Sequence, residues 1–282
     1  MAFQLKRRTL FSAGAGALAA PSLLAGFAGA QETMEKDGMA KGVDFKTLKL
    51  GSFKVTVISD GTRASDNPHE IFGTNQPAES VATLLEQNFL PTNGFVNGFA
   101  PVLVDTGSEV VLFDTGLGEG GREAGMGKLA EGLKTAGYAP DQVTVVVLTH
   151  MHGDHIGGLT EGGKPAFANA RYVTGQVEYD FWKDAARVGT AAENGHKAVL
   201  AKVVPLAEKI TFIADGGEVV PGISAMAAFG HSPGHMIYRL ESMIATDRLP
   251  FIGYHMPFPA VGFAERQDQG YRFVPASYQF DI

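Results

Sequence analysis

The stretch VTVVVLTHMHGDHIGGL, residues 143–159, decides the fold. It begins with a run of strand-forming residues, mostly valine, which predicts a buried strand. Three histidines and an aspartate follow at once, namely His150, His152, Asp154 and His155, and two glycines come directly after them. Four metal-type ligands at the end of a buried strand are hard to explain by packing alone.

These four side chains are predicted to lie in a loop after the strand, where a turn lets neighbouring side chains diverge. His150 and His152 can therefore bind one metal ion while Asp154 and His155 bind another. Imidazole nitrogen and carboxylate oxygen are ligands that zinc accepts, and a catalytic zinc site keeps one position open for water. The alternative is a polar loop with accidental histidines, which the strand-plus-ligand pattern disfavours.

Composition narrows the classes of function. The chain has 282 residues, enough for one large domain or two small ones. Its formal net charge is −7 and no lysine or arginine run marks a phosphate-binding face, so a nucleic-acid partner is not expected. Cysteine is absent, which excludes disulfides, thiol nucleophiles and thiolate ligands. Any metal site must use histidine and carboxylate.

The N-terminal residues 1–30 predict a signal peptide of the twin-arginine type. Lys6-Arg7-Arg8 precedes a weakly apolar run, and Ala28-Gly29-Ala30 is typical of a cleavage site. A retained membrane anchor is the alternative, but glycines and a proline in the run disfavour it. We therefore expect a periplasmic or secreted protein with no stable membrane span after signal removal. Residues 31–46 predict a flexible lead-in, and residues 47–282 the folded domain.

Periodicity and turn residues predict the other elements. Strands are expected at 53–58, 99–104, 110–113, 171–174, 223–229 and 236–240. Residues 199–204 and 210–213 are apolar stretches without an assigned element. Helices are expected after Pro77, at 128–136 and at 178–186, and a loop at 62–76. The helix after Pro77 places Val81, Leu84, Leu85 and Phe89 on one face.

The motif THMHGDH, residues 149–155, resembles the T-H-x-H-x-D-H motif of the metallo-β-lactamase superfamily. FDTG at 113–116 and GHSPGH at 230–235 are supporting matches in the expected order. The resemblance covers about residues 50 to 282 and implies an α+β fold, a four-layer αββα sandwich with metals at one edge. The segment GYHMPFP, residues 253–259, looks most similar to the methyl-parathion-hydrolase-like and acyl-homoserine-lactonase branch.

The resemblance also implies a ligand set for two divalent ions, zinc by ligand type. His150, His152 and His231 would bind the first ion. Asp154, His155 and a late histidine would bind the second, and His255 is the only histidine after His235. The alternative for His255 is a capped or surface histidine.

Other polar side chains are expected to support the ligands or to lie outside the site. His235 can orient the loop that carries His231. Asp114 can hold a ligand histidine by hydrogen bonds, although an Asp-Thr-Gly turn alone explains it equally well. His69 and His196 have no motif around them and are expected at the surface, and Trp182 in the core.

One part of the family pattern is missing. The superfamily usually has an aspartate bridging the two metals, and the only aspartate between His235 and His255 is Asp247. A strand end and a helix end meet at Ser242-Met243 without a turn signal, which indicates an internal deletion and a truncated second half. Either Asp247 is recruited as the bridge or the bridge is lost, and the second alternative is favoured. Lost core structure predicts reduced stability.

The sequence therefore predicts a metal-dependent hydrolase acting on a small molecule. A metal-bound hydroxide would attack an ester or lactone, a phosphotriester or an amide, and Asp154 would orient the hydroxide or pass on its proton. β-Lactamase activity is the enzymatic alternative, because a subclass with a three-histidine site and an Asp-His-His site lacks the bridge. An inactive metal-binding remnant without the bridging aspartate is the alternative of another class.

Overall fold

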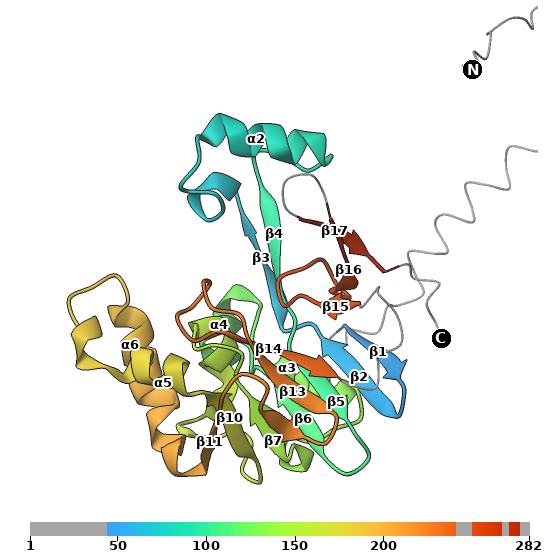
Figure 1. Cartoon of the computed structure of the whole chain (residues 1–282), viewed down its shortest axis with the longest axis vertical. Helices are drawn as coiled ribbons and strands as arrows, with labels where there is room; N and C mark the ends of the chain where they lie inside the picture. Colours follow the sequence, from blue (N-terminus) through green and yellow to red (C-terminus); the bar gives the residue numbers. More distant parts are fainter. Residues whose placement is uncertain (1–43, 241–249, 267–270, 277–282) are drawn as a thin grey trace, which may run out of the picture. The chain divides into compact units, whose positions relative to one another are not determined.

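The computed structural model describes residues 44–240, 250–266 and 271–276 (Figure 1). The predicted signal peptide, most of the lead-in, the Ser242-Met243 junction and Asp247 lie outside the described residues. Export, the deletion and the fate of the bridging aspartate therefore stay predictions. None of the helices in the described part of the chain is both long and apolar enough to cross a membrane.

A large mixed sheet carries the metal motif. Its seven strands are ordered β1 (Phe45–Leu50), β2 (Phe53–Ile58), β5 (Val102–Asp105), β6 (Val110–Phe113), β7 (Val145–Val147), β10 (Arg171–Gly175) and β11 (Ile210–Ile213). The first four are joined antiparallel, whereas β6, β7, β10 and β11 run parallel. Parallel strands end at the same edge of a sheet, so the segments that follow them meet there.

Side chains of β7 alternate between two cores, because successive residues of a strand face opposite sides of the sheet. Val146 and Leu148 belong to the core under the helices, and Val145 and Val147 to the core against a second sheet. The strand is covered on both faces, which explains its continuous apolar sequence.

Helices cover one face of the large sheet. They are α3 (Leu129–Thr135), α4 (Gly153–Ile156), α5 (Gln176–Lys183) and α6 (Glu193–Lys202). Short 3₁₀ turns occur at Pro68–Glu70, Gly118–Ala124, Pro140–Gln142, Gly157–Leu159, Ala185–Arg187 and Val204–Lys209. Leu133, Trp182 and Val199 contribute the helical side of this core.

A three-stranded sheet packs on the opposite face. It consists of β12 (Glu218–Val220), β13 (Ile223–Ala227) and β14 (Met236–Leu240), and Ile223 and Met236 fill the core between the sheets. Helices, large sheet and small sheet are three successive layers of the predicted αββα sandwich. On the outer side of the small sheet, Met226 and Ile237 are cross-strand partners and both are exposed.

The remaining strands form small sheets beside the large one. They are β3 (Gly61–Ser65) with β4 (Phe95–Phe99), β8 (Thr160–Glu161) with β9 (Lys164–Pro165), and β15 (Phe251–Ile252) with β16 (Val261–Arg266) and β17 (Tyr271–Pro275). In Figure 1, β3 and β4 form an arm with α2 (Ala78–Gln87) at its outer end.

The structure corrects two local predictions. Residues 62–65 belong to β3 instead of a loop, and the strand predicted at 99–104 is interrupted at Ala100-Pro101. Proline lacks the N–H that a continuous ladder needs, so Phe99 ends β4 and Val102 begins β5. The helix after Pro77 is confirmed as α2, but none of its residues is buried.

Candidate metal centre

The loop after β7 places the motif at the edge of the large sheet. His150 and His152 lie in the extended loop, and α4 begins at Gly153. Gly157 and Gly158 let α4 approach the segment after β6, since a Cβ there would lie 2.3 Å from the Leu117 oxygen and 2.1 Å from the Thr115 oxygen. The double glycine of the motif is thus required by close packing of two backbones.

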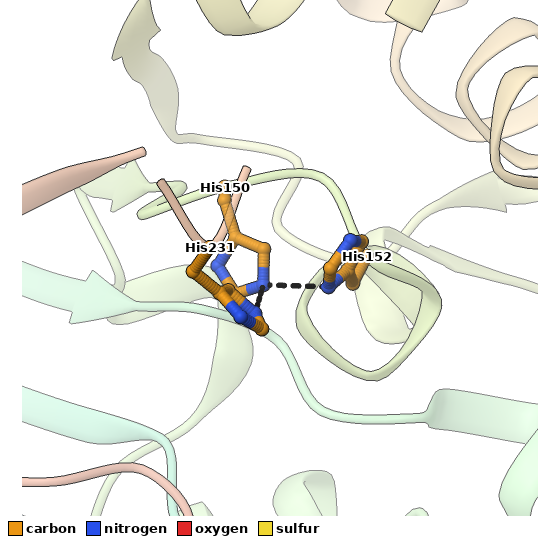
Figure 2. A group of neighbouring side chains, drawn as sticks. All are labelled: His150, His152 and His231. Carbon is orange, nitrogen blue, oxygen red and sulfur yellow. Dashed lines mark hydrogen bonds between the residues drawn. The ribbon is translucent and has the colours of Figure 1, made fainter. Parts of the chain in front are cut away.

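Three histidines from two distant segments form a first cluster. The rings of His150, His152 and His231 point toward one another in Figure 2. Nε2 of His150 lies 3.1 Å from Nδ1 of His152 and 3.1 Å from Nε2 of His231. His231 follows β13, so the large mixed sheet and the three-stranded sheet each contribute to the cluster.

Asp154, His155 and His255 form a second cluster. Oδ2 of Asp154 lies 3.4 Å from Nε2 of His155 and 3.3 Å from Nε2 of His255. The two clusters adjoin, because the ring centroids of His150 and His155 are 3.9 Å apart. In each cluster, one ligand atom per residue lies within 4.8 Å of the others.

The spacing within both clusters fits a tetrahedral ion. Ligand atoms about 2.0–2.1 Å from zinc in tetrahedral geometry stand about 3.3–3.4 Å apart. The four distances above lie between 3.1 and 3.4 Å. Imidazole and carboxylate donors are also the types that zinc binds.

Hydrogen bonds fix which ring nitrogen is free in three of the five clustered histidines. The hydroxyl of Thr149 donates to Oδ2 of Asp114 at 2.8 Å, so its oxygen accepts from Nδ1 of His150 at 3.1 Å. Nδ1 of His155 donates to the same Asp114 oxygen at 2.8 Å, and Nδ1 of His255 donates to the Gly98 carbonyl at 2.9 Å. In all three rings the lone pair is left on Nε2, the atom that faces the cluster.

His155 gives the most direct test of fit. Its side chain is 3% exposed, and among the described residues its Nε2 has no hydrogen-bond partner. Burial disfavours a charged ring, but the carboxylates of Asp114 and Asp154 outweigh it and raise the pKa of His155 to about 9. The position therefore favours a positive charge at Nε2, which a proton or a metal ion would supply.

The other ligand candidates are held in their metal-binding protonation states. Burial lowers the pKa of His150, His152, His231 and His255 below the ordinary value, so their rings are neutral near pH 7. Burial raises the pKa of Asp154, but its close ionic contact with His155 lowers the pKa to about 2. Metals bind neutral imidazole and ionised carboxylate.

The sequence model of the metallo-β-lactamase superfamily matches residues 100–244. The chain belongs to this superfamily. The match contains the motif after β7 and the GHSPGH segment, which supply five of the six clustered side chains.

Other members of the superfamily resemble the chain over different lengths. The N-acyl homoserine lactonase of Bacillus cereus is 32% identical over 152 residues, 50% of this chain and 54% of that enzyme. The chain thus spans about half the length of the curated relatives it matches.

Solved structures in the superfamily share the fold. AidC, a dizinc quorum-quenching lactonase, superposes with a TM-score of 0.72 at 21% identity, over 84% of this chain and 98% of that chain. The hydrolase AbOPH superposes with a TM-score of 0.69 at 20% identity, over 83% and 98%. At these identities the likeness shows the fold alone, and the predicted metallo-β-lactamase fold is confirmed.

The two residues predicted to support the ligands lie beside them. Asp114 accepts hydrogen bonds from the Thr149 backbone N–H, the Thr149 hydroxyl and the His155 ring. His235 donates from Nδ1 to the Ala228 carbonyl, and its ring centroid is 5.0 Å from that of His150.

Two histidines were expected at the surface. His69 is half-buried, and its Nε2 donates to the Gln76 carbonyl. The prediction for His196 is wrong: the residue is 4% exposed and its Nδ1 donates to the carbonyl of Trp182 at 2.8 Å. Trp182 is in the core as predicted, and its ring centroid is also 5.6 Å from that of His152.

Sequence reasoning missed three residues around the clusters. Tyr254 stacks on His155 with ring centroids 4.0 Å apart and donates its hydroxyl to the Asp154 carbonyl. Asp60 is fully buried and accepts from backbone N–H groups of the loop after β6. Glu178 is fully buried and contacts both histidine loops of the first cluster. Of the three, only Tyr254 lies in a segment that the sequence singled out, GYH at 253–255.

Proposed function

We propose that this chain is a metal-dependent hydrolase that opens small cyclic esters of the N-acyl homoserine lactone class. The observation that carries the proposal is the pair of adjoining three-residue clusters, each with ligand-type atoms at zinc-like spacing. Membership of the superfamily supports a hydrolase, and the lactonases among its relatives support the substrate class.

His150, His152 and His231 would hold one divalent ion, and Asp154, His155 and His255 a second. When bound, zinc ions supply Lewis-acid chemistry: they lower the pKa of water to about 7 and polarise an ester carbonyl. The donor set fits this group because the lone pairs of the buried rings are oriented in advance.

The chain's own groups hold the reacting parts. Asp154 keeps its carboxylate ionised near neutral pH and is 22% exposed, so it can accept a hydrogen bond from the attacking water and orient it. Tyr254 fixes the backbone of Asp154 through its hydroxyl. His255 is 36% exposed, so a substrate can approach the clusters on this side.

Turnover of a substrate panel by zinc-reconstituted mature protein tests the proposal. The panel contains N-hexanoyl homoserine lactone, a β-lactam and a phosphotriester. Hydrolysis of each substrate is measured by acid release or by a change in absorbance. Chelator-sensitive lactone opening is expected, and the double variant His150→Ala/His152→Ala should fall to background. His69→Ala is the matched control, because the His69 ring contacts Gln76 and belongs to neither cluster.

Other outcomes assign the chain differently. Hydrolysis of the β-lactam alone would identify a β-lactamase. Two bound metals with no turnover of any substrate would identify a metal-binding remnant. Lactone opening that survives in the double histidine variant would contradict the proposed site.

A further inference from the structure

Glu178 is a buried carboxylate that contacts both loops of the first histidine cluster. Its side chain lies on α5 and is fully buried. Oε1 accepts from the backbone N–H of Met151, between His150 and His152, at 2.8 Å. Oε2 accepts from the backbone N–H of Gly234, three residues after His231, at 2.9 Å. One side chain thus joins segments that are far apart in sequence.

Side-chain donors complete the set around Glu178. The Ser232 hydroxyl lies 2.6 Å from both carboxylate oxygens, and Nε1 of Trp182 donates to Oε1 at 2.7 Å. Every partner that the described residues offer Glu178 is a donor. This suits an ionised carboxylate, which only accepts hydrogen bonds, and leaves no place for an amide NH₂ group.

Two residues of the GHSPGH segment, Gly234 and Ser232, fit closely against Glu178. A Cβ on Gly234 would lie 2.1 Å from the backbone nitrogen of Glu178, so the close approach of the two backbones requires glycine. Ser232 is 1% exposed, and its hydroxyl faces α5 instead of the solvent. Two residues of the motif that bind no metal therefore dock the loop of His231 onto Glu178.

We propose that Glu178 is the positioning residue of the first cluster: it holds the His150–His152 loop and the His231 loop at metal-binding distance. The inference rests on the proposed metal site and deepens it. Asp114 contacts the second cluster directly through His155 and reaches the first only through the Thr149 hydroxyl. Glu178 is therefore the buried carboxylate specific to the first cluster. Loss of Glu178 should consequently weaken one metal site and spare the other.

The test is a cobalt titration of the full-length protein. Visible absorption reports on each bound ion, and equilibrium binding gives its affinity. Glu178→Gln keeps the volume of the side chain but turns an NH₂ group toward N–H donors. We expect one of the two cobalt ions to bind about 10–100-fold more weakly, as is typical when a group that orients metal ligands is lost. The lost absorption band should match the band lost in His231→Ala, and the band lost in His255→Ala should remain.

Asp180→Asn is the matched control, because Asp180 lies on the same helix, is 50% exposed and pairs with Lys183. It should bind both ions as the wild type does. Ser232→Ala removes only the hydroxyl contact and provides a milder variant if Glu178→Gln does not fold. Ser232→Ala should lower the affinity for the same ion by a smaller factor.

Outcomes separate this inference from the proposed function. Folded Glu178→Gln or Ser232→Ala that binds both ions with wild-type affinity would overturn the positioning role alone. Equal weakening of both sites, together with a lower unfolding temperature, would show a general structural role instead. A wild-type protein that binds no cobalt would overturn the metal site and this inference together.

Discussion

At the scale of single residues, hydrogen bonds outside the clusters decide which atoms face inward. Asp114 accepts from three donors on Thr149 and His155, and this leaves the Nε2 lone pairs of His150 and His155 free. Asp114 itself has a φ of 59°. Asparagine tolerates this left-handed conformation as well as aspartate does, so the side-chain chemistry can be changed without straining the backbone.

Asp114→Asn should weaken metal binding at the cluster of Asp154, His155 and His255. The amide NH₂ group of asparagine would face one of the donors that now bond to Asp114. The tautomer of His155 would then no longer be fixed. A loss of about 10–100-fold in affinity for one ion is expected, measured by competition with a chromogenic chelator. Unchanged affinity for both ions would show that Asp114 is only a turn residue.

At the scale of elements, the ligand loop depends on close packing of α4 against the segment after β6. Gly158→Ala would place a methyl carbon 2.1 Å from the Thr115 oxygen. We expect unfolding to become easier by about 1–3 kcal/mol, the usual cost of overpacking, as seen in chemical denaturation of the metal-free protein.

Gly153→Ala provides the control in the same loop, since a Cβ at Gly153 meets nothing within 4 Å. Gly153 lies in α4, where alanine is the better helix former, so stability should stay equal or rise slightly. Equal destabilisation by both substitutions would contradict the packing argument.

Elements with a strong local pattern could be predicted from sequence. The valine run of β7 and the motif after it indicated both the strand and the clustered side chains. β3 was missed because Thr62, Arg63 and Ala64 are exposed, so the strand has no apolar alternation. Because the β3–β4 arm buries few side chains, its sequence shows little alternation of apolar and polar residues.

Contacts between distant segments could not be predicted in the same way. The donors to Glu178 on Met151 and Ser232 lie 27 and 54 residues away in sequence. The partner of His196 is a backbone carbonyl on another helix. A single buried glutamate or histidine in a helical segment carries no local signal of such partners.

At the scale of the whole molecule, three described layers bury two cores, and the outer side of the small sheet exposes Met226 and Ile237. Metal ions that bind only the folded state should add to the stability that these cores provide. An ion at about 100 times its Kd stabilises the folded state by about 2.7 kcal/mol.

Chelation should therefore lower the unfolding temperature by several degrees, at about 2–4 °C per kcal/mol for a domain of this size. Differential scanning calorimetry with and without chelator, followed by zinc addition, measures the shift. The His150→Ala/His152→Ala variant should respond less, because one ion is already lost. An identical shift of the unfolding temperature in that variant would mean that the chelator removes metal from a site other than the first cluster.

The central claim is that the six clustered side chains hold two metal ions, and elemental analysis of the purified, dialysed protein tests it most directly. We predict two divalent ions per chain in the wild type and one in either His231→Ala or His255→Ala. A folded wild-type protein that retains no metal would contradict the account.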